Sequence, residues 1–367
     1  MKSKILFILH LPPPVHGSAM VGQYIKDSKV VDNAFDTRFI NLSTSSTIIE
    51  IGKNPVGKII RYFKILAKVI VSLMFYNPGV VYISITSKGL GFYKDFPVAL
   101  LAKLFRKKLV LHYHNKGVSN YQHRLLDNWL YKIVFKNTKI ILLSNSLYKD
   151  VSKYVLKENV FICPNGIPVP NGSEVVLPKN TEVPRLLFLS NLIESKGVYI
   201  LLAALKLLKD KKVQFHCNFV GGEGDISVEQ LGERIRNLSL DEHVTYLGKK
   251  YDEEKYDILK SSYCLIFPTF YSNECFPLVL LEAMMFKLPV ISTDEGGICD
   301  IIENGHTGLI VEKRNIGQLA EKIGFLIENP DSAIAMGKKA QESLFRCYTL
   351  EVFEKRLEYI LKNIILQ

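Results

Sequence analysis

The sequence lacks the cysteine patterns that mark disulfide-rich or zinc-binding proteins. Its 367 residues include six cysteines, at positions 163, 217, 264, 275, 299 and 347, with no CxxC pair and no histidine spacing typical of zinc. We therefore expect reduced cysteines in the core and strands. Neither a metal site nor a disulfide framework is indicated.

Long apolar runs are also missing. The longest candidate, residues 65–76, is interrupted by Lys68 and falls short of the roughly 18 to 20 residues of a membrane span. The apolar run Lys4–His10 follows a charged start, but no small-residue cleavage site comes after it. We expect this run to be a first buried strand and the protein to be cytoplasmic.

Two common phosphate-binding loops are absent. The loop after His10 carries a single glycine, Gly17, at the mouth of a helix, which is not a G-x-G-x-x-G fingerprint. The glycine-rich turn at 221–225 is not followed by G-K-[ST]. Taken alone, Gly17 is typical of an ordinary turn, although its backbone N–H could also approach a ligand.

Acidic residues are scarce in the first half of the chain. Residues 1–166 contain 24 Lys and Arg against 8 Asp and Glu, a net charge of +16, whereas residues 167–367 contain 23 against 28, a net charge of −5. A basic half favours an anionic membrane surface or a phosphorylated substrate as partner. We expect no nucleic-acid partner, since no zinc finger, RNP-type or helix-turn-helix pattern is present.

Residues 56–75 predict an amphipathic basic helix. Apolar residues recur at helical spacing with lysines and Arg61 in the gaps. In one interpretation the apolar residues, among them Ile59, Ile60, Phe63 and Ile70, pack into the core. In the other, the basic edge helps to hold the protein, as a peripheral protein, on the inner face of an anionic membrane.

The order of predicted elements indicates an α/β fold in two domains. Short apolar runs alternate with helical segments twice along the chain, first up to about residue 163 and again from residue 185. Between them, residues 164–184 are rich in proline, glycine and asparagine and form the best linker. We expect an N-terminal domain at 1–166 and a C-terminal domain at 167–348.

One stretch of the second half, Pro268 to Pro289, has a pattern typical of a ligand site. An apolar strand runs into a polar loop that carries Glu274, and a helix that opens at Pro277 carries Glu282. The two carboxylates can face one ligand at that helix end, because helical side chains lean toward the N-terminus. The helix end itself favours a diphosphate. The alternative is a core helix with a capping carboxylate and a buried, paired Glu282.

Two further polar residues stand at the ends of predicted strands. His114 follows a strand at the edge where open α/β sheets place their ligands, although a structural histidine is the alternative. Lys196 lies beside Gly197 at a helix N-terminus, where a cation opposes the helix dipole unless an anion intervenes. That conflict hints at phosphate, and an exposed surface lysine is the alternative.

These residues together resemble the family-4 retaining glycosyltransferases with the GT-B architecture. Glu274 and Glu282 match the motif of two glutamates separated by seven residues, inside FPTFYSNECFPLVLLEAMMFKLPVISTDEGG. The segments SNLIESKG, VTYLGK and NGHTGLIV occur around it in the order that the family has. The resemblance covers residues 186–311 strongly and the first half loosely.

The resemblance implies two Rossmann-like domains that face each other across a cleft, with a C-terminal helix, about 349–367, that crosses back to the first domain. The second domain would hold a nucleotide sugar, and the first would bind a saccharide or lipid-linked acceptor. Glu282 would bind the ribose, Glu274 the donor sugar and Lys196 the diphosphate. His114 would lie near the donor sugar and Gly17 near the diphosphate. Other donor-binding residues would be Ser190, Asn191, Tyr246, Leu247, Gly248, Phe276, Pro277, Leu278 and Val279.

The resemblance also implies transfer with retention and without a metal or other cofactor, in agreement with the absence of any Asp-x-Asp sequence. Lys196 and the helix end would assist departure of the diphosphate. Two positions depart from the family. Ser190 and Asn191 replace its Gly-Arg pair, and Pro277 replaces a glycine, so we expect the amides of Leu278 and Val279 to make more of the anion contact.

The sequence is compatible with three functions. The first is a glycosyltransferase that uses a UDP-sugar to build a cell-surface polysaccharide or glycolipid. The second is a nucleotide-sugar epimerase of the same architecture, which needs additional acid and base groups around the sugar. The third is a non-catalytic nucleotide-binding or membrane-docking module, which predicts that loss of Glu274 or Glu282 has no effect. A pyridoxal-phosphate phosphorylase is disfavoured by the length of the chain.

Overall fold

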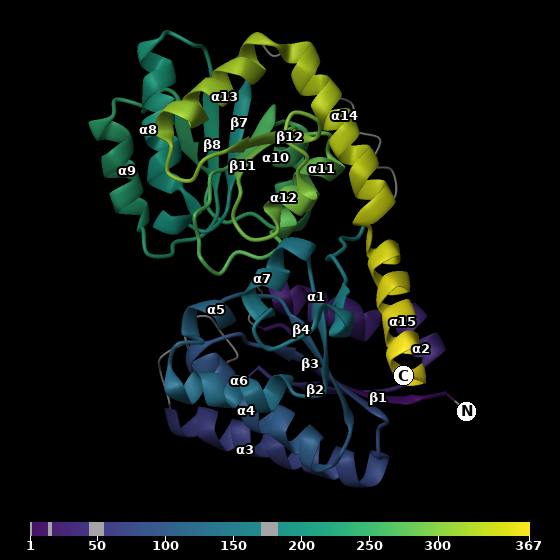
Figure 1. Ribbon diagram of the computed structural model, residues 1–367. Coiled ribbons are helices and arrows are strands. Elements are labelled where there is room, and N and C mark those ends of the chain that lie inside the picture. The colour runs from purple at the N-terminus through teal and green to yellow at the C-terminus, as the bar shows by residue number, and fades with distance from the viewer. Residues whose placement is uncertain (1, 14–16, 44–54, 170–182) are drawn as a thin grey trace. The chain divides into compact units, whose positions relative to one another are not determined.

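The computed structural model describes residues 2–13, 17–43, 55–169 and 183–367 (Figure 1). The chain divides into two compact units, residues 1–166 together with 350–367, and residues 167–349. The first unit ends at Gly166, the residue that the sequence gives as the domain boundary. Most of the predicted linker, at 170–182, lies outside the described residues.

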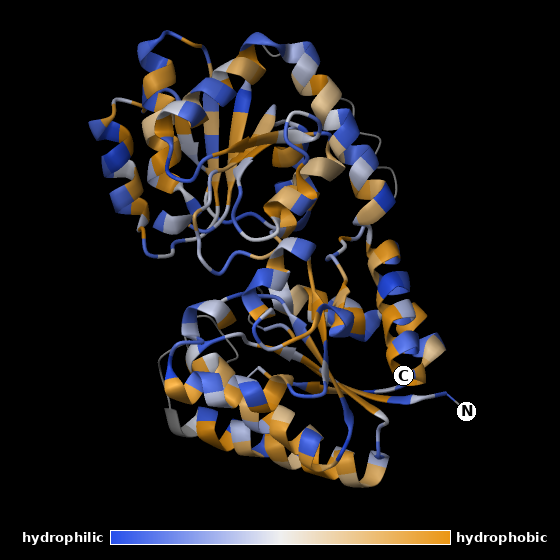
Figure 2. Ribbon diagram, viewed as in Figure 1, coloured by the Kyte–Doolittle hydropathy of each residue, from blue (hydrophilic) through white to orange (hydrophobic). Residues whose placement is uncertain are grey.

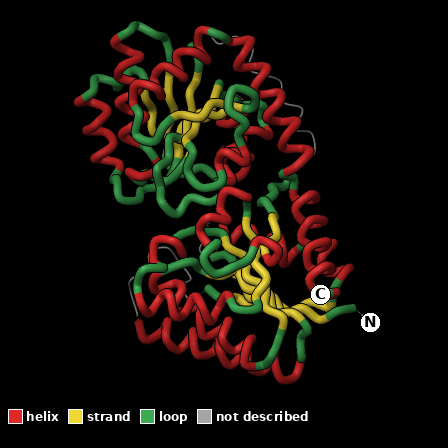
Figure 3. Tube along the Cα trace, viewed as in Figure 1, coloured by secondary structure: helices red, strands yellow, loops and turns green. Residues whose placement is uncertain are grey.

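Each unit contains one six-stranded sheet in which every strand pair is parallel. Figure 3 shows the strands of both sheets in yellow and the helices around them in red. The strands of the first sheet are β1 (Lys4–Leu9), β2 (Asp36–Asn41), β3 (Val80–Ile85), β4 (Lys108–Tyr113), β5 (Thr138–Leu142) and β6 (Val160–Ile162). Those of the second sheet are β7 (Arg185–Leu189), β8 (His216–Val220), β9 (Val244–Tyr246), β10 (Cys264–Phe267), β11 (Val290–Thr293) and β12 (Gly308–Val311). The predicted α/β class is confirmed.

Helices cover both faces of each sheet, as Figure 1 shows. The first unit has α1 (Gly17–Asp27), α2 (Lys29–Ala34), α3 (Pro55–Val71), α4 (Gly89–Leu104), α5 (Val118–Tyr121), α6 (Leu125–Phe135), α7 (Tyr148–Val151) and α15 (Leu350–Leu366). The second has α8 (Val198–Asp210), α9 (Val228–Asn237), α10 (Asp252–Lys260), α11 (Leu278–Met285), α12 (Ile298–Ile301), α13 (Ile316–Glu328) and α14 (Pro330–Cys347). Strands buried on both faces explain the near-continuous apolar runs, such as VVYISI in β3, in which all six residues are buried.

The last helix, α15, belongs to the first unit although the preceding helix, α14, belongs to the second. Phe353, Leu357 and Leu361 of α15 are buried in the same core as Ile5 and Phe7 of β1. The chain passes from one unit to the other at residues 348–349, where the two helices are interrupted. None of the six cysteines, which all lie in the described residues, forms a disulfide.

Helix α3 packs differently from the core interpretation. Ile65, Val69 and Leu73 are buried, at the i, i+4 and i+8 spacing of one helical stripe that continues into a π-helical turn, η1 (Ser72–Tyr76). The prediction of further core residues on this helix was wrong, because four of them are exposed: Ile59, Ile60, Phe63 and Ile70. The helix therefore has two apolar stripes, of which the one with Ile65, Val69 and Leu73 is buried and the one with the four exposed residues is not.

Gly337 allows α14 to approach the preceding chain closely. A Cβ atom at this position would lie 1.9 Å from the carbonyl oxygen of Lys287, so Gly337→Ala should destabilise the protein by about 1–3 kcal/mol. Gly232→Ala, in the middle of α9, is the matched control. Its Cβ would meet only the end of Arg236 at 3.5 Å, and alanine favours a helix by about 0.5–1 kcal/mol. Urea unfolding measures the free energy of unfolding of each variant. Equal values for the two variants would refute the close approach at Gly337.

Candidate active site

The order of strands in the second sheet selects one place for a ligand. The order is β12-β11-β10-β7-β8-β9, so the chain starts at β7, builds outward through β8 and β9, and then returns to the other side of β7 with β10. The loops that follow β7 and β10 therefore leave the same edge of the sheet in opposite directions. Ligands of open parallel sheets bind at such a switch point. Lys196 comes from the first of these loops and Glu274 from the second.

Lys196 and Glu274 form an ion pair between the Nζ and Oε2 atoms. The two side chains are 14% and 10% exposed, so most of the pair is shielded from water. The ammonium group also lies over two aromatic rings, 4.7 Å from the ring centroid of Tyr271 and 5.2 Å from that of Phe267. A cation held between a carboxylate and aromatic faces is fixed in position, as recognition of an anion requires.

Close backbone contacts hold the two loops together. The amide of Phe270 donates to the carbonyl of Ser195 over 2.7 Å. Gly197, at φ +91°, lets the β7 loop lie against Pro268, whose carbonyl oxygen is 2.4 Å from the position that a Cβ would take. Gly296, at φ +61°, likewise lies against the backbone carbonyl of Glu274. The position of the ion pair thus depends on glycines that no other residue replaces without movement.

The helix that follows Glu274 begins one residue later than the sequence predicts. Pro277 is the N-cap of α11, with an extended backbone at φ −68° and ψ 119°, so it is not the first helical residue. Leu278 and Val279 are the first two residues of the helix, where amides have no acceptor within the helix itself. The next amide, of Leu280, donates to the carbonyl of Pro277 over 3.2 Å. The amides of Leu278 and Val279 are therefore the donors that this helix end offers.

Glu282, on the second turn of α11, pairs with Lys255 of α10 over 2.8 Å. Its side chain is 15% exposed. Burial raises the pKa of this carboxyl, and the nearby Lys255 ammonium offsets part of the increase. A carboxylate that keeps one oxygen on a lysine can accept hydrogen bonds at the other, and that is the chemistry of binding a pair of sugar hydroxyls.

The predicted base-binding and loop residues lie together at the ends of β7, β8 and β9. Asn191 accepts a hydrogen bond from the amide of Gly222 over 3.2 Å through its side-chain oxygen. The carbonyl of Ser190 leaves no room for a side chain at Gly221, since a Cβ there would lie 1.8 Å away. The Tyr246 hydroxyl donates to the carbonyl of Gly221 over 2.8 Å. These contacts make one rigid loop cluster in the second unit.

The last strand of this cluster ends in Leu247 and Gly248. The Leu247 amide donates to a carbonyl of β8, and the Gly248 carbonyl accepts from the amide of Gly221, each over 2.9 Å. Phe276, by contrast, is buried against Tyr348, with ring centroids 5.7 Å apart, so its side chain has a packing role. A contact from Phe276 to a donor would have to come from its backbone.

The predicted residues of the first unit are His114 and Gly17. His114 follows β4, and its ring lies 4.1 Å from that of His112, as alternation along a strand predicts. His112 is fully buried and bonded to the Tyr82 hydroxyl, and burial together with His114 holds its pKa well below the usual value. Gly17 is the first residue of α1, is exposed, and has open space where a Cβ would lie. Their roles stay predictions.

Three residues at the candidate site were not expected from the sequence. Lys255 and Tyr271 each contact a predicted site residue. Lys249 lies beside the loop cluster, with its Cε 2.1 Å from where a Cβ of Gly222 would be. Spacing along the chain could not reveal these contacts, because each one joins two segments that are distant in the sequence.

Within the described ranges, no group of three or more His, Cys, Asp or Glu side chains could hold a metal ion. Among the same residues, no helix has the length and apolar character needed to cross a membrane.

The fold is that of the GT-B glycosyltransferases. A glycosyltransferase from Rickettsia africae ESF-5 superposes with a TM-score of 0.72 at 22% identity, covering 99% of both chains. Sucrose-phosphate synthase from Thermosynechococcus elongatus superposes with a TM-score of 0.74 at 18% identity over 100% of both chains. The UDP complex of Anabaena HepE gives a TM-score of 0.75 at 16% identity, covering 98% of this chain and 100% of the other.

The sequence comparisons match a family model to the second half of the chain. The family described as glycosyl transferases group 1 matches residues 173–343, which include Lys196, Glu274 and Glu282. Over these residues, just under half of the chain, the protein is similar to the group 1 glycosyl transferases.

Two curated relatives show how far this similarity extends. An uncharacterized glycosyltransferase of Methanocaldococcus jannaschii is 26% identical over 252 residues, 67% of each chain. The poly(ribitol-phosphate) α-N-acetylglucosaminyltransferase of Staphylococcus aureus is 27% identical over 223 residues, 59% of this chain and 43% of the relative. The match thus spans less than half the length of the second relative.

Proposed function

We propose that this chain is a retaining glycosyltransferase of family 4 that moves a sugar from a UDP-sugar to a saccharide or lipid-linked saccharide acceptor, in the synthesis of a cell-surface polysaccharide or glycolipid. The observation that carries the proposal is the Lys196–Glu274 ion pair at the switch point of the second sheet, followed by Glu282 on α11. All three residues lie in the part of the chain that matches the family.

In this proposal each group has a defined role. Lys196 and the amides of Leu278 and Val279 stabilise the negative charge that grows on the diphosphate as its bond to C1 of the sugar breaks. Glu274 accepts hydrogen bonds from donor-sugar hydroxyls and holds Lys196 in place. Glu282 accepts hydrogen bonds from the ribose. The acceptor oxygen bonds to C1 on the face that the diphosphate leaves, and its proton departs with the nucleotide.

The choice of donor and acceptor is supported by proteins of similar fold and sequence. Anabaena HepE has been solved with UDP and with UDP-glucose, and the S. aureus relative is named for transfer to poly(ribitol-phosphate). We propose UDP as the carrier and a polymer or lipid-linked glycan as acceptor on these grounds. Because Lys196 and the helix end supply positive charge, we propose that the reaction needs no metal or other cofactor.

A thermal-shift panel tests the proposed donor. UDP, GDP, ADP and their sugars are added separately to the protein, with and without EDTA. A ligand that binds only the folded protein raises the melting temperature in proportion to its affinity. We expect the largest rise with UDP or a UDP-sugar, unchanged by EDTA. A rise with GDP or ADP alone would show that the donor carries that nucleotide and not UDP. No rise with any nucleotide would overturn the proposal.

His114 is predicted to act on turnover. His114→Ala should lower kcat by about 10²-fold or more with little change in UDP affinity, since a group that acts in the transition state adds little to ground-state binding. His123→Ala, which removes an exposed histidine of the same unit, should retain full activity and is the matched control. Equal kcat in His114→Ala and the intact protein would remove His114 from the site.

A further inference from the structure

Helix α3 and the turn that follows it carry an exposed apolar stripe. Its members are Ile59, Ile60, Phe63, Ala67, Ile70, Val71, Met74 and Phe75, and we refer to them as the α3 face. At about 100° per residue, the members on α3 itself fall within an arc of about 120°. Phe63 is 63% and Phe75 77% exposed, unusual for side chains of this size. Figure 2 shows the hydrophobic colour along α3.

Positive charge borders this stripe. Lys64 and Lys68 are exposed and lie next to Val71 around the circumference of the helix, so they border the stripe along one side. No aspartate or glutamate occurs between Glu50 and Asp95 in the sequence. An apolar stripe bordered by lysines, with no acidic residue in the whole segment, is complementary to an anionic lipid surface. An acidic headgroup layer supplies the negative charge, and its acyl region takes the apolar side chains.

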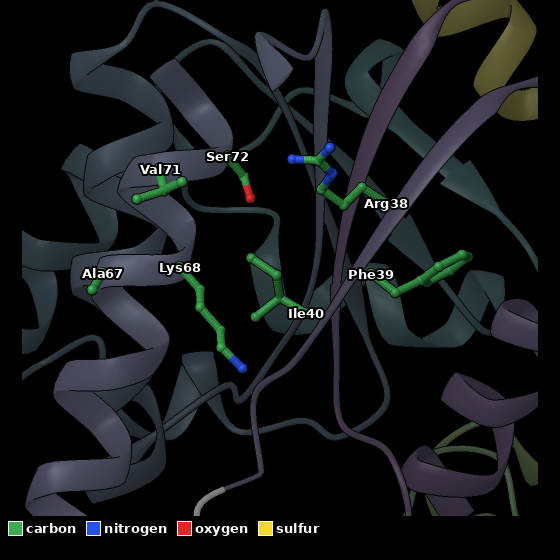
Figure 4. Close-up of a pocket in the computed structure, with 7 residues that line it drawn as sticks. All are labelled: Arg38, Phe39, Ile40, Ala67, Lys68, Val71 and Ser72. Atoms are coloured by element: carbon green, nitrogen blue, oxygen red, sulfur yellow. The ribbon is translucent and has the colours of Figure 1, made fainter. Parts of the chain in front are cut away.

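A groove adjoins the α3 face. It is about 370 Å³ in volume and is lined by Arg38, Phe39, Ile40, Ala67, Lys68, Val71 and Ser72. Figure 4 shows the Arg38 guanidinium and the Lys68 ammonium on either side of Ile40, with Val71 and Ala67 along the helix wall. Arg38 also stacks on the ring of Tyr76, 4.4 Å from its centroid, which limits its freedom. Two cations beside apolar walls suit a phosphate that is attached to a hydrocarbon chain.

We propose that the α3 face docks on an anionic phospholipid bilayer, with a lipid phosphate held at the groove by Arg38 and Lys68. The occupant is the bilayer and not a second protein, because α3 and the turn after it contain no acidic side chain, the exposed Asp36 beside Tyr76 lies among the cations Arg38 and Lys4, and the whole first half carries an excess of positive charge. The inference extends the proposed function and does not depend on it, since lipid binding is measured without a donor or an acceptor.

Vesicle flotation tests the docking. The purified chain is mixed with phosphatidylcholine vesicles, or with vesicles that contain phosphatidylglycerol at about one third of the lipid, at low and high salt. We expect binding to the anionic vesicles, weaker binding at high salt and little binding to phosphatidylcholine alone. Free inorganic phosphate, added at constant ionic strength, should not release the protein, because the apolar face supplies much of the affinity.

Two variants of the α3 face report on its apolar and its basic parts. Phe63→Ser with Phe75→Ser, and Lys64→Glu with Lys68→Glu, should each weaken binding to anionic vesicles by about tenfold or more. Circular dichroism checks that each variant is folded.

Two matched variants on α14 distinguish docking by the α3 face from nonspecific adsorption of the protein to vesicles. Phe345→Ser replaces a 44% exposed phenylalanine, and Lys338→Glu with Lys339→Glu reverses two exposed lysines. Both should bind vesicles as the intact protein does, because neither changes the α3 face.

Four outcomes would overturn the proposal. The first is absence of binding to anionic vesicles, and the second is equal binding by the α3-face variants and the intact protein. The third is release by free phosphate, because the groove would then be a site for a soluble anion. The fourth is a dimer in light scattering that both α3-face variants break while vesicle binding is absent, because the stripe would then be an interface between two copies of the chain.

Discussion

Lys196→Met is expected to lower kcat/KM for glycosyl transfer by about 10²–10³-fold, the cost of removing one group that stabilises developing charge in a shielded site. The size of this loss in kcat/KM follows from the surroundings of Lys196, which is 14% exposed and held between Glu274 and two aromatic rings. Water cannot readily replace a cation in such a place. Transfer kinetics with a saturating acceptor measure the effect.

The matched control is Lys206→Met on α8. Lys206 makes an exposed ion pair with Asp210 four residues later, so its loss should leave kcat/KM unchanged. Since removal of Lys196 also leaves a nearly buried Glu274 without its partner, Lys196→Met with Glu274→Gln is the third variant. We expect the double variant to be about as inactive as the single one, because the residues act as a unit. Activity of Lys196→Met within about threefold of the intact protein would refute its role.

Glu282→Gln is expected to weaken nucleotide binding by about 10–100-fold, the equivalent of one or two hydrogen bonds to a charged group. The amide keeps the shape of the side chain but removes its charge and one of its acceptors. Isothermal titration with UDP measures the affinity directly. Glu254→Gln is the matched control, since Glu254 pairs with Lys250 on the exposed side of α10. Equal UDP affinity in both variants would contradict a ribose contact by Glu282.

The raised pKa of Glu282 gives this contact a pH dependence. Burial favours the protonated carboxyl, so lowering the pH converts Glu282 to a form that accepts hydrogen bonds less well, and UDP affinity should fall. The effect on folding has the opposite sign. A carboxyl with a raised pKa in the folded state contributes stability at low pH that is lost as the pH rises through that pKa. Titrations between about pH 5 and 8 should therefore show weaker UDP binding at the acid end, and Glu282→Gln should flatten the profile.

The α/β class and most strands could be predicted from the sequence, because a parallel strand covered on both faces is a short continuous apolar run with little else that resembles it. The run Lys4–His10, expected as a first buried strand, contains β1 (Lys4–Leu9), and β7 (Arg185–Leu189) starts at the residue where the second series of strands is expected. Lys196 and Glu274 could also be singled out, since each stands in a loop that leads into a helix, and so could Glu282, which follows Glu274 on the second turn of that helix.

The partners of these residues could not be predicted. Lys196 and Glu274 are 78 residues apart, and Lys255 and Glu282 are 27 apart, so each contact depends on the order of strands in the sheet. Helix α3 was misjudged for a different reason. Apolar residues occur on most of its circumference, and periodicity cannot tell which of two stripes meets the sheet. Proline is compatible with both the N-cap and the first helical position, and the extended backbone of Pro277 shows that it is the N-cap.

We propose that Lys196, Glu274 and Glu282 together bind a UDP-sugar for transfer. The most direct test is release of UDP from a panel of UDP-sugars, with and without a mixture of saccharide acceptors, by the intact protein and by Lys196→Met. We expect UDP release from at least one donor, faster with an acceptor and reduced by about 10²-fold or more in the variant. Release that is unaffected by Lys196→Met, or no release from any UDP-sugar, would contradict it.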